Sequence, residues 1–129
     1  MAMRDQIRIM VVDDMSTSRG LITQALDACG VQHVSTAEDG SDALRILARA
    51  PVHLVISDYN MPNMDGLQLL HQLRNGAKTK GVGFILITGR AEQQIIDHGR
   101  KLGMNNFLKK PFEPAALRVS DLLCMSNLG

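Results

Sequence analysis

Four short, mostly apolar runs and one mixed run, Val31–Ala37, occur along the chain, and polar or turn-forming residues follow each of them. Runs of this length that are rich in valine and isoleucine and apolar at almost every position are typical of strands covered on both faces of a parallel sheet. We therefore predict strands at Ile7–Val12, Val31–Ala37, Val52–Ile56, Gly83–Thr88 and Asn106–Leu108.

Between these runs, apolar residues recur every three or four positions, which is the spacing of one face of a helix. Serine, threonine and aspartate stand at several expected helix starts, and glycine or proline follows the expected ends. Five strands that alternate with five helices predict an α/β fold, a doubly wound parallel sheet with right-handed crossovers and helices on both faces. The helices are predicted from Ser16 to Cys29, from Asp39 or Ser41 to Ala50, from Leu67 to about Asn75, from Ala91 to Leu102 and from Glu113 to about Cys124.

Composition narrows the class of protein. The 129 residues fit a single domain, residues 1–129, that can bury a core without disulfides or a structural metal. Hydrophobic residues make up 45% and charged residues 21%, and no apolar run approaches the ~18 residues of a membrane span. A net charge of +1 and an aromatic content of 3% argue against nucleic-acid binding. Because Met1–Ile7 contains no apolar signal segment, we expect a cytoplasmic protein.

An acid, Asp58, stands two residues after the predicted central strand. The next residues, Tyr59–Gly66, supply asparagine, proline, aspartate and glycine, which favour a turn. Ligands of open parallel sheets bind outside the carboxyl ends of the strands, so Asp58 is our candidate reactive group. Taken alone, an acid at this position is also a common turn former or helix cap.

Polar residues end four of the five predicted strands, and parallel strands bring all these ends to one edge of the sheet. Three carboxylates at that edge would repel one another, and a hard divalent cation such as Mg²⁺ would compensate them. A lysine ammonium and a threonine hydroxyl could then bind phosphoryl oxygens. Taken alone, the lysine could be an ordinary surface charge and the threonine a helix cap. Together these parts match phosphoryl transfer to a carboxylate nucleophile, with an aspartyl phosphate as product. The residues are Asp13, Asp14, Asp58, Thr88 and Lys110.

A family resemblance rests on the same residues. The segments Val11–Asp14, Asp58–Gly66, Ile87–Gly89 and Lys110–Phe112 look like the receiver domains of two-component response regulators, and most closely the single-domain chemotaxis regulators of the CheY type. The resemblance covers nearly the whole chain. It implies a flavodoxin-like receiver fold with the strand order 2-1-3-4-5.

The resemblance also implies roles for the acids at the strand ends. Asp58 is similar to the phosphoacceptor of the family. Mg²⁺ is implied as the cofactor, with Asp13, Asp14, Asp58 and the main-chain carbonyl of Asn60 as the metal site.

The conformational switch of the family is implied at two further positions. Thr88 resembles the switch hydroxyl, and Lys110, rather than Lys109, resembles the phosphate-binding lysine. Phe107 stands where the family has a rotating aromatic residue, although it could equally be a core residue. Arg90 lies where motor-binding members often carry an acid, so we expect it to alter the lifetime of the aspartyl phosphate.

The implied function is that of a stand-alone, monomeric response regulator in chemotaxis. Its implied partners are a histidine kinase of the chemotaxis CheA type, the flagellar motor switch protein or another output partner, and a phosphatase, without nucleic acid or membrane. It would catalyse only its own phosphorylation and dephosphorylation. A phosphate sink or a phosphorelay intermediate remains open as the output role.

Two other classes fit less well. A Mg²⁺-dependent phosphohydrolase of the haloacid-dehalogenase type needs a second acid two residues after the nucleophile, where this chain has Asn60. A nucleotide or flavin site would require a glycine-rich fingerprint after the first strand, and the sequence lacks one.

Overall fold

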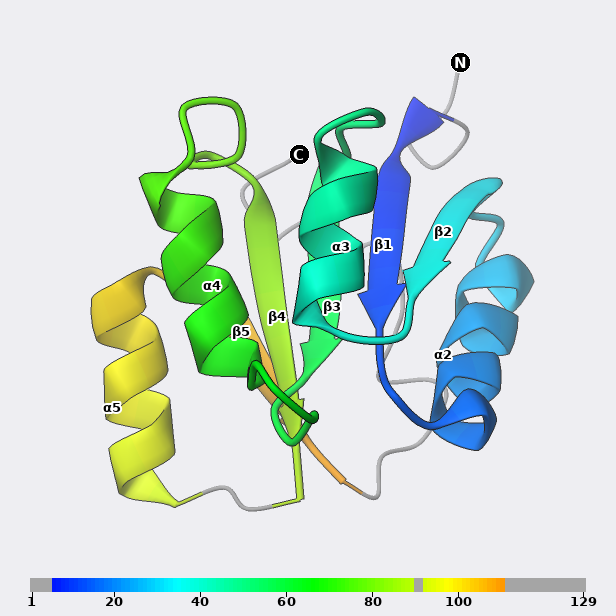
Figure 1. Cartoon of the computed structure of the whole chain (residues 1–129). Coiled ribbons are helices and arrows are strands. Elements are labelled where there is room, and N and C mark those ends of the chain that lie inside the picture. Colours follow the sequence, from blue (N-terminus) through cyan, green and yellow to red (C-terminus); the bar gives the residue numbers. More distant parts are fainter. Residues whose placement is uncertain (1–5, 90–91, 111–129) are drawn as a thin grey trace.

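A computed structural model describes residues 6–89 and 92–110 of the chain. All five predicted strands are present, and they form one parallel sheet in the order β2-β1-β3-β4-β5 (Figure 1). The strand order implied by the family resemblance is therefore confirmed. The strands are β1 (Arg8–Val12), β2 (His33–Ala37), β3 (Leu54–Asp58), β4 (Gly83–Thr88) and β5 (Asn106–Lys109).

The described residues contain four helices instead of the five predicted. The fifth, predicted from Glu113 to Cys124, lies outside the described residues. Asp39, and not Ser41, caps the start of α3, because its side chain accepts a hydrogen bond of 2.8 Å from the Asp42 N–H. The helices are α2 (Ser16–Ala28), α3 (Gly40–Leu47), α4 (Gly66–Asn75) and α5 (Gln93–Leu102).

The start of β2 differs from the prediction because the end of α2 extends into the predicted strand. Gly30 has a φ of 89°, and its N–H donates to the Asp27 carbonyl at 2.9 Å. The Val31 N–H donates to the Leu26 carbonyl at 3.1 Å, which completes a Schellman motif. Val31 therefore belongs to the helix ending, and the strand begins at His33.

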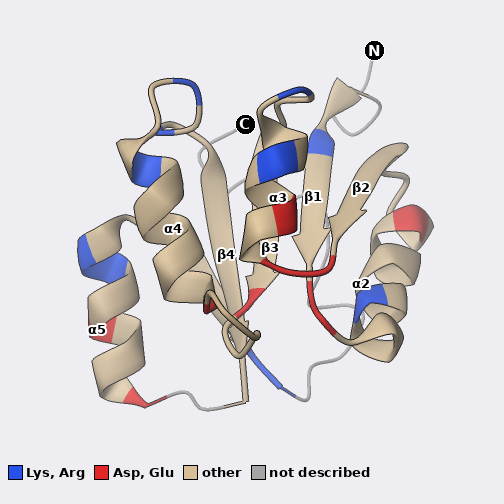
Figure 2. Cartoon of the chain, in the orientation of Figure 1, with Lys and Arg blue, Asp and Glu red and all other residues tan. Residues whose placement is uncertain are grey.

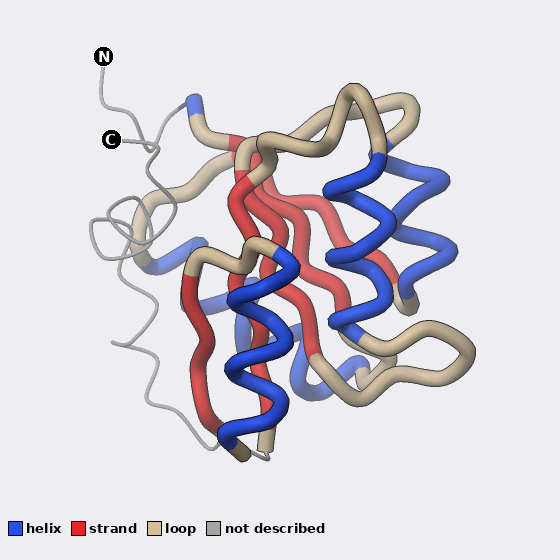
Figure 3. Tube along the Cα trace, turned by 90° about the vertical axis from the view of Figure 1, so that its left-hand side faces the viewer, coloured by secondary structure: helices blue, strands red, loops and turns tan. Residues whose placement is uncertain are grey.

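Alternate residues of the strands face two separate hydrophobic cores. In β1, Met10 and Val12 pack toward α3, α4 and α5, whereas Ile9 and Val11 pack toward α2. The layer formed by α3 and α4 lies to the right of the strands in Figure 3. Strands β3 and β4 are buried at every position, which accounts for their unbroken apolar sequences.

Within residues 6–89 and 92–110, no helix has both the length and the apolar content needed to cross a bilayer.

Candidate functional site

The register of the sheet brings the predicted site residues to one edge. Val12, the last residue of β1, pairs with Ser57 of β3, so Asp13 follows β1 beside the end of β3 at Asp58. Asp58 pairs with Ile87, and Thr88 pairs with Lys109. Figure 2 shows acidic segments at the lower ends of β1 and β3 and a basic segment at the lower end of β5. This edge adjoins the point where the chain order reverses between β1 and β3, which is the usual ligand site of such folds.

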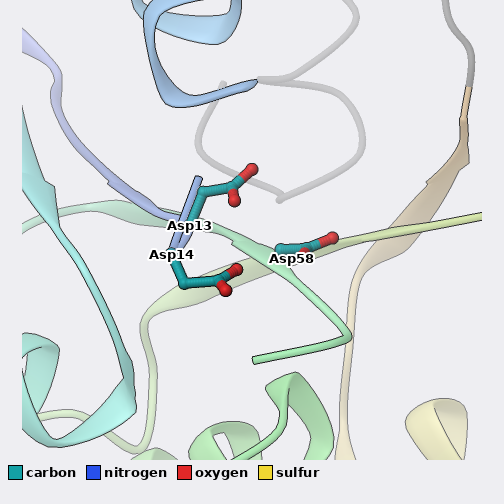
Figure 4. Close-up of side chains that lie close together, drawn as sticks. All are labelled: Asp13, Asp14 and Asp58. Atoms are coloured by element: carbon teal, nitrogen blue, oxygen red, sulfur yellow. The ribbon is translucent and has the colours of Figure 1, made fainter. Parts of the chain in front are cut away.

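Three carboxylates meet there. Asp13, Asp14 and Asp58 each offer one oxygen such that the three atoms lie within 4.8 Å of one another. In Figure 4, the side chains of Asp13 and Asp14 extend from the end of β1 toward the side on which Asp58 lies. The expected convergence of these three acids is thus present in the structure.

Asp13 is the most enclosed of the three acids, with an exposed fraction of 0%. Its Oδ1 accepts a hydrogen bond of 2.9 Å from the Met15 N–H, whereas its buried Oδ2 has no hydrogen-bond partner among the described residues. Burial raises the pKa of Asp13 above its ordinary 3.8; the Met15 bond acts against this shift, and the Asp58 charge acts with it. A buried, unpartnered carboxylate oxygen beside two other acids fits a hard cation that takes oxygen ligands.

Asp58 is paired with the expected lysine. The Nζ of Lys110 lies 2.9 Å from Oδ1 of Asp58, and the Asp58 side chain is 8% exposed. Lys110 is held in turn by its main chain, because its N–H donates to the Thr88 carbonyl at 2.8 Å. The ammonium thus places a positive charge where a phosphoryl group on Asp58 would carry negative charge.

An open cleft of about 650 Å³ surrounds these groups. Thr88 and the turn residue Asn60 line it, as the sequence led us to expect, and so does Gly89. Met15 and Tyr59 also line it and were not predicted, although each directly follows a predicted acid. The acids and Lys110 are therefore accessible to a small molecule from solvent.

The turn after Asp58 is fixed by tight packing. A Cβ on Gly66 would lie 2.6 Å from the carbonyl oxygen of Asp58 and 2.7 Å from Cδ1 of Leu86, so only glycine fits this contact. Met61 is buried in the core, as expected of a loop-packing residue. Asn63 takes a positive φ of 68°, which asparagine tolerates better than most residues. These contacts fix the path of the loop that carries Asn60.

Two of the predicted functional residues are not found in this cleft: one lies elsewhere in the fold, and the other lies outside the described residues. Phe107 is partly buried against the core on β5 and is not among the residues that line the cleft. Arg90 lies outside the described residues. The predicted roles of both residues in switching and in phosphoryl lifetime stay predictions.

Comparison with known proteins points to one family. The family model described as the response regulator receiver domain matches residues 9–120. A probable chemotaxis protein CheY from Rhizobium etli is 39% identical over 112 residues, which are 87% of this chain and 87% of the relative.

Two solved structures extend the comparison. The chemotaxis protein CheY4 of Vibrio cholerae superposes with a TM-score of 0.81 at 30% identity, over 86% of this chain and 92% of that one. The receiver domain of a sensor histidine kinase from Pseudomonas aeruginosa gives a TM-score of 0.82 at 26% identity, over 94% and 97% of the two chains. That structure has a magnesium ion coordinated in its active-site cleft.

Proposed function

The chain belongs to the family of response regulator receiver domains, and we propose that it is a stand-alone chemotaxis regulator that accepts a phosphoryl group on Asp58. The observation that carries the proposal is the combination at one sheet edge of three clustered carboxylates with a lysine 2.9 Å from one of them. A cation site and a phosphate-binding charge beside a carboxylate nucleophile are the parts that phosphoryl transfer requires. The magnesium-bound relative adds support for the metal.

The proposed donor is a phosphohistidine of a histidine kinase of the CheA type. A carboxylate oxygen of Asp58 attacks the phosphorus, the P–N bond of the donor breaks with its electron pair on the imidazole, and a P–O bond to Asp58 forms. Lys110 neutralises charge on the phosphoryl oxygens, and the Thr88 hydroxyl lines the same cleft as a donor.

Asp13, Asp14, Asp58 and the Asn60 carbonyl are the groups that would hold Mg²⁺, which when bound would offset the remaining charge of the phosphoryl oxygens. Apart from its own phosphorylation and dephosphorylation, we assign the protein no catalytic activity.

The docking surface for the donor is proposed at the start of α2. Met15 and Leu21 are the exposed large hydrophobic residues of the described part of the chain, at 57% and 58%. Met15 also lines the cleft that holds Asp58, so we place the donor contact at Met15 and extend it along α2 to Leu21. Exposed apolar residues beside a reactive cleft are a common mark of a protein contact.

The output is proposed as a change in partner affinity, with the flagellar motor switch as the partner. Phosphorylation adds charge and acceptor oxygens beside Thr88 on β4. Phe107 lies on the adjacent strand, where it pairs with Leu86, so a shift of Thr88 can reach the surface formed by α5 and β5.

The chemistry is tested by incubating the protein with acetyl phosphate and Mg²⁺ and measuring its intact mass. We expect a one-phosphate adduct in the wild type and in Asp97→Asn, an exposed acid on α5, and none in Asp58→Asn. An adduct that persists in Asp58→Asn would refute the assignment of the phosphoacceptor. Binding of a motor-switch peptide with and without beryllofluoride then tests the output, and an unchanged affinity would favour a phosphate sink or relay.

A further inference from the structure

Asp13 is fixed by three hydrogen bonds, one with β2, one with the N-cap residue of α2 and one with a side chain of α2. Its N–H donates to the Ala37 carbonyl of β2 at 3.1 Å, which extends the pairing of β1 with β2. Its side-chain Oδ1 accepts from the Met15 N–H at 2.9 Å. Its main-chain carbonyl accepts from Nη1 of Arg19, a half-buried side chain of α2, at 2.7 Å. Only Oδ2 is left without a hydrogen-bond partner among the described residues, and the carboxylate that carries it belongs to the acid cluster.

The bond from Arg19 fixes the peptide group that joins the two acids of the metal site. This peptide runs from the Asp13 carbonyl to the Asp14 N–H, so its orientation sets the direction in which the Asp14 side chain leaves the backbone. Asp14 is exposed, and packing contributes little to the placement of its carboxylate. The Arg19 N–H donates to the Met15 carbonyl at 2.9 Å, which is the first i→i−4 bond of α2 and holds Arg19 beside the loop.

The position of Arg19 is unfavourable for the helix itself. Arg19 is the fourth residue of α2, and cations near a helix N-terminus oppose the helix dipole by typically about 0.3–1 kcal/mol. No acidic residue stands in the first turn of α2 to offset it. The guanidinium is therefore better explained by its contact with the end of β1 than by the stability of α2.

We propose that Arg19 is a positioning residue for the metal site, acting through the Asp13–Asp14 peptide. This inference rests on the proposed function, because it concerns the affinity of the same acids for Mg²⁺. Groups that orient metal ligands typically change metal affinity by about 10–100-fold when they are removed.

A role of Arg19 through its charge and a role through positioning predict opposite changes in Mg²⁺ affinity when Arg19 is replaced. The direction of the change therefore tests the proposal. If Arg19 acted only through its charge, its removal would take a cation away from the acid cluster and tighten Mg²⁺ binding. If it acts by fixing the peptide, its removal lets the two carboxylates separate, and Mg²⁺ binding weakens.

The test is Mg²⁺ titration by calorimetry of the wild type, Arg19→Met and Arg45→Met. Methionine is of similar length but has neither charge nor donor, and Arg45 is a matched control because it is an exposed helix arginine paired with Asp42, outside the cleft lining. We expect Arg19→Met to bind Mg²⁺ about tenfold more weakly and Arg45→Met to bind it as the wild type does. Affinity equal to or tighter than that of the wild type in Arg19→Met would overturn the proposal.

Amide hydrogen exchange of the metal-free protein gives a second readout. Loss of the Arg19 bond should raise the exchange rate of the Met15 amide, which donates to Oδ1 of Asp13, and an unchanged rate there would count against the proposal. If Arg19→Met does not fold, Arg19→Lys replaces it. The lysine keeps the charge with a single donor group, so it should bind Mg²⁺ more weakly than the wild type, and equal or tighter binding would again overturn the proposal.

The same experiment separates this inference from the proposed function. A wild type that binds no Mg²⁺ and takes no phosphate would refute the proposed function itself. A wild type that does both, together with an Arg19→Met variant that binds Mg²⁺ equally well, would refute only the role of Arg19.

Discussion

The ion pair between Lys110 and Asp58, at 2.9 Å, joins the ends of two strands that are not neighbours. Asp58 ends β3, Lys110 follows β5, and β4 lies between them in the sheet. Two strand spacings amount to about 10 Å, which the flexible lysine side chain bridges. The contact therefore passes the end of β4, where Thr88 and Gly89 line the cleft. A phosphoryl group on Asp58 would meet Lys110 and Thr88 together.

Replacing Lys110 should affect metal binding and phosphorylation in opposite directions. In Lys110→Met the acid cluster loses its paired cation, so Mg²⁺ should bind several-fold more tightly. Phosphorylation by acetyl phosphate at saturating Mg²⁺ should slow by about 100-fold, because the charge that stabilises the phosphoryl oxygens is lost. Calorimetry and intact-mass kinetics measure the two effects. A weaker Mg²⁺ affinity would show that the ion pair supports the metal site instead of competing with it.

The buried carboxyl of Asp13 should make the metal-free protein less stable as the pH rises. Burial raises its pKa above 3.8, so the folded protein holds this proton more tightly than the unfolded chain does. The stability that the proton supplies is complete below about pH 3.8 and is lost as the pH rises through the raised pKa.

Asp13→Asn removes this buried charge. In excess chelator at pH 7 the variant should be more stable than the wild type, with a Tm higher by a few degrees. Added Mg²⁺ should raise the Tm of the wild type and not that of the variant. Asp97→Asn, at an exposed site, serves as the control and should match the wild type. If Asp13→Asn has a lower Tm than the wild type in excess chelator, the Asp13 carboxylate is not an uncompensated buried charge.

Two glycines should respond to alanine with opposite signs. In Gly66→Ala the added Cβ meets the Asp58 carbonyl oxygen and Leu86, so we expect a loss of about 2 kcal/mol in the free energy of unfolding. Gly20 lies inside α2 with nothing within 4 Å of an added Cβ, so Gly20→Ala should gain about 0.5–1 kcal/mol. Urea unfolding measures both changes. If both substitutions change the free energy of unfolding equally, the structure around Gly66 can shift to accommodate the added Cβ at little cost.

The proposed donor surface on α2 should matter for protein donors alone. In Leu21→Asp an exposed apolar contact becomes a charge, and we expect phosphotransfer from the kinase to slow by about tenfold, as for loss of one substantial interface residue. The rate with acetyl phosphate is the internal control and should not change, because Leu21 does not line the cleft. If the wild type and Leu21→Asp accept phosphate from the kinase at equal rates, Leu21 on α2 is not part of the docking surface.

The sequence determined which residues the site would contain. Apolar runs separated by helical periodicity require parallel strands, and parallel strands place the residues that follow them, among them Asp13, Asp58 and Lys110, at one edge. The family resemblance supplied the strand order. Local sequence did not reveal where β2 begins, because the Schellman motif at Gly30 draws Val31 into the helix ending. The role of Phe107 was open from the sequence and stays open.

Tertiary structure alone decided how the site is held. Arg19 bonds the Asp13 carbonyl, and Arg74 donates to the carbonyls of Val82 at 2.6 Å and Gly103 at 2.7 Å, which ties α4 to the loops before β4 and after α5. Burial lowers the pKa of this Arg74 guanidinium below its ordinary value. Both arginines bind main-chain oxygens, which every residue carries, so the sequence gives no pattern that identifies their partners. Strand ends follow from local periodicity, whereas contacts between a side chain and a distant carbonyl exist only after the chain has folded.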